Sequence, residues 1–428
     1  MSRTRRITWT ALAVVLAGAV AACTYAWQPA IAPLDHPPAA SADRALLAQG
    51  ARVADLADCM QCHTAKGGKP YAGGLALETP FGTIYSTNIT PDAETGIGRW
   101  PLEAFARAMR KGVSRDGHLL YPAFPYAHFT RMSDDDIAAL YAYLLARTPV
   151  HAPAQDNALA FPLNFRPLVA GWNLLFLDEG ALPPPGTPQS DAWLRGRYLV
   201  EGPGHCAACH TPMNAFGAEK GSQAYAGGLI DGWDVPPLNA LTLARTPWTH
   251  AQLTSYLRTG LATEHGAAAG PMLPVTQHLA NVPVSDVEAM ATYLMSLQPP
   301  AAAHPPAQAD LPAASAQRIN DGAALFASSC AGCHGAAAPM RTVGARPSLE
   351  LSTALNADSP RNAIQLVLGG NPWNGSSSAH YMPPFANVLN DAQIADVLAY
   401  ARAQYAQRPA WNGLQDSVAA IRKENPQQ

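Results

Sequence analysis

Apolar side chains recur with a helical period in three separate stretches of this chain, and each stretch contains the same series of three helices. At 101–111, for instance, Leu102, Phe105 and Met109 share one face, and Pro101 stands at the first turn. The series are expected at 43–59, 101–111 and 134–145; at 191–200, 249–258 and 285–297; and at 316–328, 360–368 and 391–404. The pattern predicts an all-α chain built on a threefold internal repeat.

Glycine and tyrosine stand at matching places in the three series. A glycine lies in each first helix and a tyrosine in each last helix, namely Gly50 and Tyr143, Gly196 and Tyr293, and Gly322 and Tyr400. A helix crossing at which the glycine accommodates the aromatic residue would explain both features. A glycine also ends each middle helix, at Gly112, Gly260 and Gly369.

The first 30 residues have the layout of a signal peptide or of a membrane or lipid anchor. Arg3, Arg5 and Arg6 precede a predominantly apolar run at 7–22, as in an export signal. Three outcomes fit this pattern: lipidation of Cys23, a single retained span that extends to residue 27, and simple cleavage with an incidental cysteine.

The segments between and after the repeats differ in character. The connector 149–190 carries many large apolar residues, which need burial between domains or against a partner protein: Phe161, Phe165, Trp172, Leu174, Leu175, Phe176 and Leu177. The linker 299–315 is rich in Ala and Pro and is expected to be a semi-rigid tether, on which the third domain moves. The tail 409–428 is expected to be either bound to the surface or loose.

Composition adds two limits to this picture. The net charge of −3 gives no indication of a nucleic-acid partner. The 39 prolines and 33 glycines indicate long loops between short helices.

Cys-x-x-Cys-His occurs three times and accounts for six of the 7 cysteines. The pairs are Cys59 and Cys62, Cys206 and Cys209, and Cys330 and Cys333, followed by His63, His210 and His334. Two thiols three residues apart lie on one helical turn, so both can form thioethers with one porphyrin while the histidine becomes the proximal iron ligand. One such motif would also fit a redox dithiol, a disulfide or a zinc site, but three predict three covalent c-type haems.

Methionines ahead of two of the closing helices are candidate distal ligands. Met382 lies in Tyr-Met-Pro-Pro-Phe, and Met272 lies in Gly-Pro-Met-Leu-Pro. A haem that only transfers electrons usually has both axial positions filled, and thioether sulfur raises its potential. We therefore expect Met382 and Met272 on the distal side of the third and second haems.

The first stretch departs from this pattern because Phe124 stands where the others have methionine. Phenylalanine cannot bind iron. Three arrangements remain open: His128 as distal ligand, which would lower the potential of this haem, Met132 as distal ligand, or an open or otherwise ligated iron.

Three segments resemble the triple-haem cytochrome c subunits of bacterial membrane-bound dehydrogenases. They are Thr-Pro-Phe-Gly-Thr-Ile-Tyr-Ser-Thr-Asn-Ile-Thr-Pro-Asp at 79–92, the stretch 121–126, and Gly-Arg-Tyr-Leu-Val at 196–200. The resemblance covers most of the chain after about residue 40 and implies three tandem class I cytochrome c-like domains with long irregular loops, preceded by the signal or anchor segment. The expected boundaries are 1–30 for that segment, 41–148, 191–298 and 316–408 for the domains, 149–190 and 299–315 for the connectors, and 409–428 for the tail.

The resemblance implies an electron-transfer subunit that is not itself an enzyme. Electrons would come from a catalytic dehydrogenase subunit of the flavin, quinone-cofactor or molybdenum type. They would go to membrane quinone or a terminal oxidase, at the periplasmic face of the bacterial cytoplasmic membrane. Analogy slightly favours a molybdenum-hydroxylase or aldehyde-oxidising partner. A haem with two protein ligands also leaves no place for a substrate.

Two other functions fit parts of the sequence. An open first haem would suit a peroxidase or reductase, and a chain without a fixed partner would be a free electron shuttle. Carbon monoxide binding to one reduced haem would favour the enzyme. A stable complex with a dehydrogenase subunit would argue against the shuttle.

Overall fold

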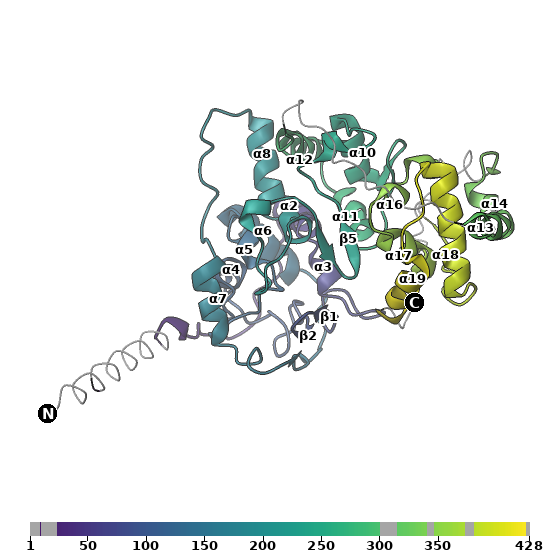
Figure 1. The fold of residues 1–428 in the computed structure, drawn as a ribbon. Helices are drawn as coiled ribbons and strands as arrows, with labels where there is room; N and C mark the ends of the chain where they lie inside the picture. Colours follow the sequence, from purple (N-terminus) through teal and green to yellow (C-terminus); the bar gives the residue numbers. More distant parts are fainter. Residues whose placement is uncertain (1–8, 10–23, 300–314, 340–345, 373–380, 425–428) are drawn as a thin grey trace. The chain divides into compact units, whose positions relative to one another are not determined.

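The structure is a computed structural model, and it describes residues 9, 24–299, 315–339, 346–372 and 381–424. Cys23 and nearly all of the linker 299–315 lie outside the described residues. The chain divides into two compact units (Figure 1): unit 1 comprises 1–188, 198–205 and 214–218, and unit 2 comprises 189–197, 206–213 and 219–428. Unit 2 holds most of the second helix series and all of the third, so the three-domain organisation stays a prediction of the sequence.

Unit 1 contains the first helix series and one small sheet. Its helices are α2 (Arg44–Leu56), α3 (Cys59–Cys62), α4 (Leu102–Lys111), α5 (Tyr126–Phe129), α6 (Asp134–Leu145) and α7 (Leu168–Phe176). Strands β1 (Ala76–Thr79), β2 (Gly82–Tyr85) and β3 (Ala158–Leu159) form an antiparallel sheet in the order β1-β2-β3. Helix α8 (Asp191–Glu201) contributes residues to both units.

Unit 2 repeats the plan twice. The second series comprises α9 (Cys206–His210), α10 (His250–Thr259), α11 (Met272–Leu279) and α12 (Val284–Ser296), with hairpins β4 (Gly228–Ile230)–β5 (Trp233–Val235) and β6 (Leu261–Ala262)–β7 (Gly266–Ala267). The third comprises α13 (Ala316–Ser329), α14 (Ala331–His334), α16 (Thr353–Asn356), α17 (Arg361–Gly369), α18 (Asp391–Ala401), the π-helix η5 (Arg402–Ala406) and α19 (Leu414–Glu424). Short 3-10 turns are η1 (Gly221–Gln223), η2 (Leu241–Leu243) and η3 (Leu349–Leu351). The fold is mostly helical, as predicted, but its short strands mean that it is not purely α.

Local backbone conformation explains where the first helix differs from its expected range. The Asp43 side chain caps α2 by accepting from the amides of Ala45 and Leu46. The helix then ends at Leu56, and Asp58 adopts a left-handed conformation with φ 50°. This break starts the separate turn α3, so Cys59 lies on a short helix of its own.

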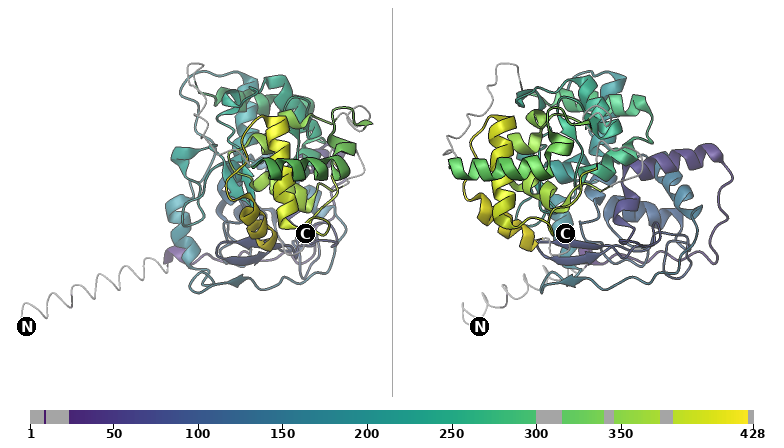
Figure 2. Two further views of the ribbon diagram at one scale, coloured as in Figure 1. Left: turned by 45° about the vertical axis from the view of Figure 1, so that its right-hand side comes forward. Right: turned by 90° about the vertical axis from the view of Figure 1, so that its right-hand side faces the viewer.

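The glycine–tyrosine crossing is present in all three series. A Cβ atom placed on Gly50 would lie 2.0 Å from the carbonyl oxygen of Ala139 and 2.6 Å from the Cβ of Tyr143. The corresponding distances to the carbonyl oxygen are 1.9 Å at Gly196 and 2.1 Å at Gly322, where the nearby aromatics are again Tyr293 and Tyr400. Figure 2 shows α13 lying across α18 in the third series. The prediction of a close crossing is confirmed, because any side chain at these glycines would force the helices apart.

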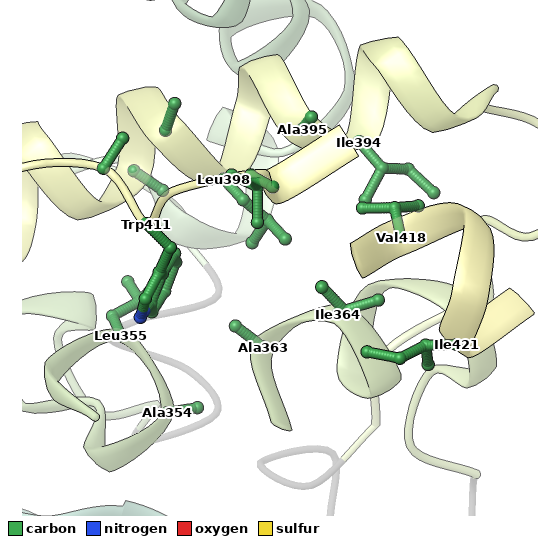
Figure 3. Packing of buried hydrophobic residues seen from close by; sticks show 14 of the residues in the cluster. Ala354, Leu355, Ala363, Ile364, Ile394, Ala395, Leu398, Trp411, Val418 and Ile421 are labelled. Carbon is green, nitrogen blue, oxygen red and sulfur yellow. The ribbon is translucent and has the colours of Figure 1, made fainter. Parts of the chain in front are cut away.

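The loose alternative for the tail is wrong, because its described residues 409–424 pack into unit 2. Residues Leu414, Val418 and Ile421 of α19 are at most 3% exposed and belong to the same apolar cluster as Ile364 and Ile394 (Figure 3). Their i, i+4, i+7 spacing is that of an apolar helix face, which needs a partner surface.

A buried arginine holds the chain that leads into α19. Arg402 donates to the carbonyl oxygens of Leu355, Ala357 and Pro409, and its guanidinium lies 3.8 Å from the centre of the Trp411 ring. Burial lowers the pKa of Arg402 to about 10, so the group stays charged at neutral pH. The segment after residue 408 is therefore part of the core of unit 2.

Helix α7 lies within the connector 149–190. One side of this helix is buried and the other is exposed. Val169, Ala170 and Asn173 are buried, whereas Leu174 and Leu175 are 69% and 70% exposed. Among the described residues, none of the helices combines the length and the apolarity needed to cross a bilayer.

Candidate haem-attachment sites

The cysteines of all three motifs are free thiols on single helical turns. The turn is closed in the first motif by the amide of His63, which donates to Cys59 O at 3.0 Å, and in the third by the amide of His334, which donates to Cys330 O at 2.9 Å. Burial raises the pKa of Cys206 to about 12 and that of Cys330 to about 11. Thiols with raised pKa values do not fit a redox dithiol, whose attacking cysteine needs a lowered one. Two free thiols on one turn are what covalent attachment to one porphyrin requires.

The ring of His63 is oriented by a backbone carbonyl far along the chain. Its Nδ1 lies 2.6 Å from Thr87 O. The Thr64 hydroxyl accepts from the amide of Tyr71 at 3.2 Å, and Tyr71 O accepts from the amide of Ile89 at 2.9 Å. These contacts tie the histidine, the residue after it and the loop carrying Thr87 to one another. We call this set of bonds the proximal clamp.

The second motif has the same proximal clamp. His210 Nδ1 lies 2.7 Å from Pro236 O. The Thr211 hydroxyl accepts from the amide of Tyr225 at 3.0 Å, and Tyr225 O accepts from the amide of Leu238 at 2.9 Å. The two tyrosines also share a left-handed backbone, with φ 62° in the first region and 59° in the second. The two regions therefore agree bond for bond around the histidine.

Glycine is needed next to each clamp. Gly73 donates its amide to His63 O at 2.8 Å, and Gly227 donates to His210 O at 2.9 Å. Both have positive φ, 73° and 92°, and a Cβ on Gly73 would lie 2.4 Å from the carbonyl carbon of Thr87. The backbone at Gly73 can approach Thr87 this closely because glycine has no Cβ atom.

The clamp prepares each imidazole to bind iron. A carbonyl oxygen only accepts, so Nδ1 carries the proton and Nε2 keeps its lone pair for a metal. Burial lowers the pKa of His63, and it lowers the pKa of His210 to about 4, so both rings are neutral at physiological pH. Neutral, oriented imidazoles beside paired thiols fit haem c.

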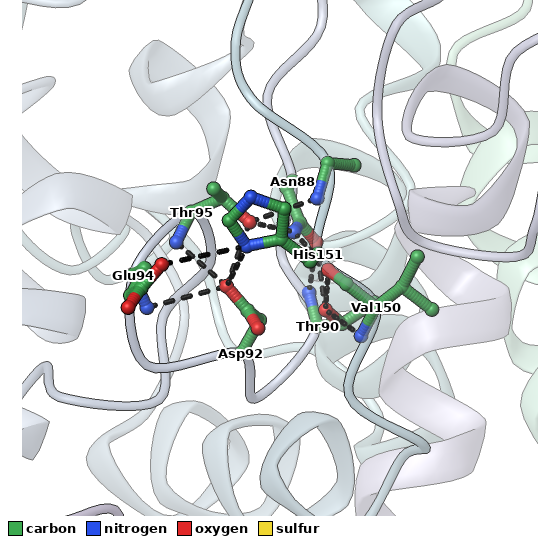
Figure 4. Close-up of polar contacts among 8 residues, drawn as sticks. Asn88, Thr90, Asp92, Glu94, Thr95, Val150 and His151 are labelled. Carbon is green, nitrogen blue, oxygen red and sulfur yellow. Dashed lines mark hydrogen bonds and ion pairs between the residues drawn. The ribbon is translucent and has the colours of Figure 1, made fainter.

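A network of side-chain hydrogen bonds supports the first clamp from behind (Figure 4). Asn88, which follows Thr87, donates to Thr95 Oγ1 at 3.0 Å and to Val150 O at 2.7 Å. The Asp92 carboxylate accepts from the amide of Thr95 at 2.7 Å, and these hydrogen bonds hold the pKa of Asp92 below its usual value. The segment that carried the family resemblance is therefore the wall that positions His63.

The third motif shows the same neutral histidine in another setting. Burial, together with the nearby charge of Arg346, lowers the pKa of His334 to about 4. Residues 340–345 lie outside the described residues, and no acceptor is assigned to this ring.

The two candidate methionine ligands of unit 2 precede the closing helices α12 and α18 in the chain. Met272 is half-buried at the start of α11, directly after Pro271. Met382 is half-buried and pairs with Asn371 in an isolated antiparallel bridge, with N–O distances of 2.8 and 2.9 Å. This bridge fixes the backbone of Met382 against the end of α17. Phe124 of the first region instead packs on the ring of Phe129, with centroids 5.5 Å apart.

By its backbone hydrogen bond, Met132 occupies the position in the first region that corresponds to Val282 in the second. The amide of Met132 donates to Phe129 O at 3.0 Å, and the amide of Val282 donates to Leu279 O at 3.1 Å, each at the turn before the closing helix. Met132 is 3% exposed and belongs to the apolar cluster on which Cys59 packs. A thioether thus stands in the first region where the second has only an aliphatic side chain.

His128 has a histidine as its counterpart. Its carbonyl accepts from the amide of Arg131 at 2.9 Å, just as His278 O accepts from the amide of Asn281 at 3.0 Å. The His128 ring lies with Nδ1 3.1 Å from Glu201 O. A histidine at this position therefore also occurs in the region that has Met272.

The proximal clamp is the part of the site that the motifs alone did not predict. The acceptors Thr87 and Pro236 lie 24 and 26 residues beyond their histidines. A signal was present, however, because Tyr-Ala-Gly-Gly-Leu occurs twice, at 71–75 and 225–229. Each copy begins at the clamp tyrosine.

Comparisons with known proteins agree with this geometry. A family model described as cytochrome c matches residues 47–148 and 195–298, and one described as cytochrome c oxidase, cbb3-type, subunit III matches 317–400. A nicotinate dehydrogenase subunit of Pseudomonas putida is 49% identical over 92% of this chain, which spans only 33% of that protein.

Two further relatives match along most of their own length. The gluconate 2-dehydrogenase cytochrome c subunit of Pantoea cypripedii is 37% identical over 90% of this chain and 91% of its own. The alcohol dehydrogenase (quinone) cytochrome c subunit of Gluconobacter oxydans is 38% identical over 85% of this chain and 79% of its own.

Proposed function

The chain belongs to the cytochrome c family, among the cytochrome c subunits of dehydrogenases, and on that premise we propose that it carries electrons through three covalent haems from a catalytic partner to membrane quinone or a terminal oxidase. The prediction of an electron-carrying subunit that binds haem c and is not itself the dehydrogenase is confirmed by this membership. A haem c supplies a one-electron iron couple. The observation that carries the proposal is the proximal clamp, present twice with the same bonds.

The protein's own residues have two tasks at each haem. Cys59 and Cys62, and their counterparts in the other motifs, attach the porphyrin. His63, His210 and His334 are the proximal ligands, held neutral by burial, and in the first two regions they are oriented by a carbonyl. With a haem bound, a ring held by the clamp would need little reorganisation when the iron changes its oxidation state.

Met272 and Met382 are the distal ligands in our proposal, and Met132 takes this role in the first region. His128 has a counterpart, His278, in a region that has its own methionine, so a histidine there does not replace a missing thioether. Met132 stands where the second region has Val282, in the region with Phe124 at the expected methionine position, and it is buried in the cluster on which Cys59 packs. Three thioether-ligated haems would all have high potentials.

The partner is proposed to be a dehydrogenase for aromatic N-heterocycles, of the molybdenum-hydroxylase type that analogy slightly favours. The support is that identity to the nicotinate dehydrogenase relative is 49%, against 37% and 38% for the gluconate and alcohol relatives. The complex would work at the periplasmic face of the cytoplasmic membrane, in line with the export-type N-terminus.

The test is to isolate the complex through a tag on this chain and to follow its haem absorption. Nicotinate, gluconate and ethanol serve as probes of three substrate classes. We expect reduction of the haems by nicotinate alone. Reduction only by gluconate or ethanol would overturn the assignment of the partner, and purification of the chain without any catalytic subunit would overturn the partnership. Intact mass should correspond to three attached haems.

A further inference from the structure

The exposed side of α7 is uncharged and has no hydrogen-bonding side chain. Leu168, Gly171, Leu174 and Leu175 lie on it, opposite the buried Val169, Ala170 and Asn173. The segment ahead of the helix adds more open apolar surface. The large exposed side chains are Phe161 at 86%, Leu163 at 39%, Phe165 at 57%, Leu168 at 48%, Leu174 at 69% and Leu175 at 70%. We call these six residues the α7 patch.

The charges next to the α7 patch are engaged inside unit 1. Arg166, the one charged residue between 161 and 177, donates to Leu119 O at 3.1 Å and stacks on the Tyr121 ring. Acidic residues begin only after the helix, where Asp178 pairs with Arg131 and Glu179 pairs with Lys111. Asp178 and Glu179 are nevertheless 86% and 50% exposed, so the patch is an apolar surface with an acidic edge beyond the end of α7.

The start of the described chain lies against the other side of the same helix (Figure 1). Ala26 packs on the buried cluster formed by Val113, Leu119, Val169 and Ala170. The next residues are fixed by the amide of Ile31, which donates to Arg115 O at 2.8 Å. The chain from residue 24 on is therefore anchored beside α7, and the predominantly apolar run 7–22 precedes it in the sequence.

Aromatic side chains mark the same place. Tyr25 and Trp27, directly after the apolar run, are 48% and 71% exposed. Tyrosine and tryptophan are enriched at the boundary between headgroups and acyl chains. The α7 patch and two exposed aromatics thus belong to neighbouring segments of unit 1, just after the sequence's apolar run.

From this juxtaposition we propose that the α7 patch inserts into the outer part of the bilayer and orients unit 1 on the membrane. The proposal rests on the membrane-face location given above and adds the contacting surface. The occupant is the acyl-chain and headgroup boundary of a lipid bilayer, into which a helix of this kind sinks its apolar side.

The test uses the full haem-loaded chain on vesicles of phosphatidylcholine and phosphatidylglycerol that contain a photoactivatable acyl chain. Cross-links are mapped by mass spectrometry of peptides. We expect them in the peptide that contains Phe161–Phe176. Peptides with Leu229 and Val388, which are 59% and 67% exposed in unit 2, are the matched controls and should have about tenfold fewer.

Paired variants sharpen the result. L174E with L175E should reduce cross-linking of the α7 patch by about tenfold or more, whereas L229E with V388E should leave it unchanged, because only the first pair places charge in the apolar boundary. Visible spectra of both variants report whether the haem regions remain folded.

Each other outcome has a definite meaning. Vesicle binding with cross-links confined to residues 1–27 would overturn the α7 patch and leave the membrane location standing. Absence of vesicle binding would overturn both, while haem reduction by the partner would still test electron transfer. Equal labelling of Leu229 and Val388 peptides would show non-specific contact. Protection of Leu174 by the catalytic subunit alone would assign the patch to that subunit instead.

Discussion

The first and second haem-attachment regions agree around the proximal histidine and differ at the positions proposed for the distal ligand. Around His63 and His210 they share a carbonyl acceptor, a threonine hydroxyl and a left-handed tyrosine. They differ at the positions that we propose for the distal ligand, where the second region has Met272 and the first has Phe124 and Met132. The proximal side needs one geometry to hold an imidazole, whereas the distal side accepts any side chain that reaches the metal.

Removing one pair of thiols should have the largest effect and tests whether the two regions are equivalent. The double variants C59S with C62S and C206S with C209S should each lose one haem, because the thioethers are the covalent attachment. Intact mass measures the loss. If either variant kept the full haem content, that region would not attach a porphyrin through its motif.

Exchanging the distal candidates tests the difference between the regions. M132L should lower the potential of one haem by several tenths of a volt, within the range of about 0.8 V that axial ligands span, and M272L should do the same for another haem. Resolved redox titrations measure both.

The histidines are the matched controls for this exchange. H128L and H278L should leave all potentials within a few tens of millivolts, a small part of the range of about 0.8 V that ligand exchange covers. A large shift in H128L with none in M132L would reverse our assignment in favour of His128.

Removing the hydroxyls of Thr64 and Thr211 tests the proximal clamp that the two regions share. T64V and T211V leave the buried amides of Tyr71 and Tyr225 without an acceptor, which should cost about 1–3 kcal/mol in each region. Thermal unfolding followed by haem absorption measures the cost. T263V, at an exposed threonine, is the control, and equal stability of all three variants would show that the clamp bonds add nothing.

The smallest effect is expected from removal of the Asp92 carboxylate, which belongs to the hydrogen-bond network behind the first clamp. Hydrogen bonds lower the pKa of Asp92, so its stabilising contribution is present above the ordinary carboxyl range and is lost as the pH falls through the lowered value. D92A should therefore cost about 1 kcal/mol at pH 7, and its difference from the wild type should narrow below about pH 4.

Unfolding curves at several pH values measure this dependence. E94A removes the exposed neighbouring carboxylate and should change nothing, since the Glu94 side chain is 81% exposed. A pH-independent difference for D92A would show that its effect is unrelated to ionisation.

Local sequence predicted the features that depend on nearby residues. The attachment turns, the helices and the crossings at Gly50, Gly196 and Gly322 follow from short-range spacing and repetition. The clamp was not predicted because its acceptors are main-chain atoms that any residue provides, more than 20 positions away. The tail was misjudged because Leu414, Val418 and Ile421 were not recognised as one helix face.

The use of main-chain oxygens in the clamp limits how this protein can change over time. Every amino acid has the same carbonyl, so no point mutation at residue 87 or 236 can exchange the atom that faces the imidazole. The hydrogen bond that sets the basicity of the imidazole therefore persists when the side chains around it are substituted. Adjustment of the haem potentials to a new electron donor would then depend on side chains such as the proposed distal ligands. A single codon change can replace such a side chain.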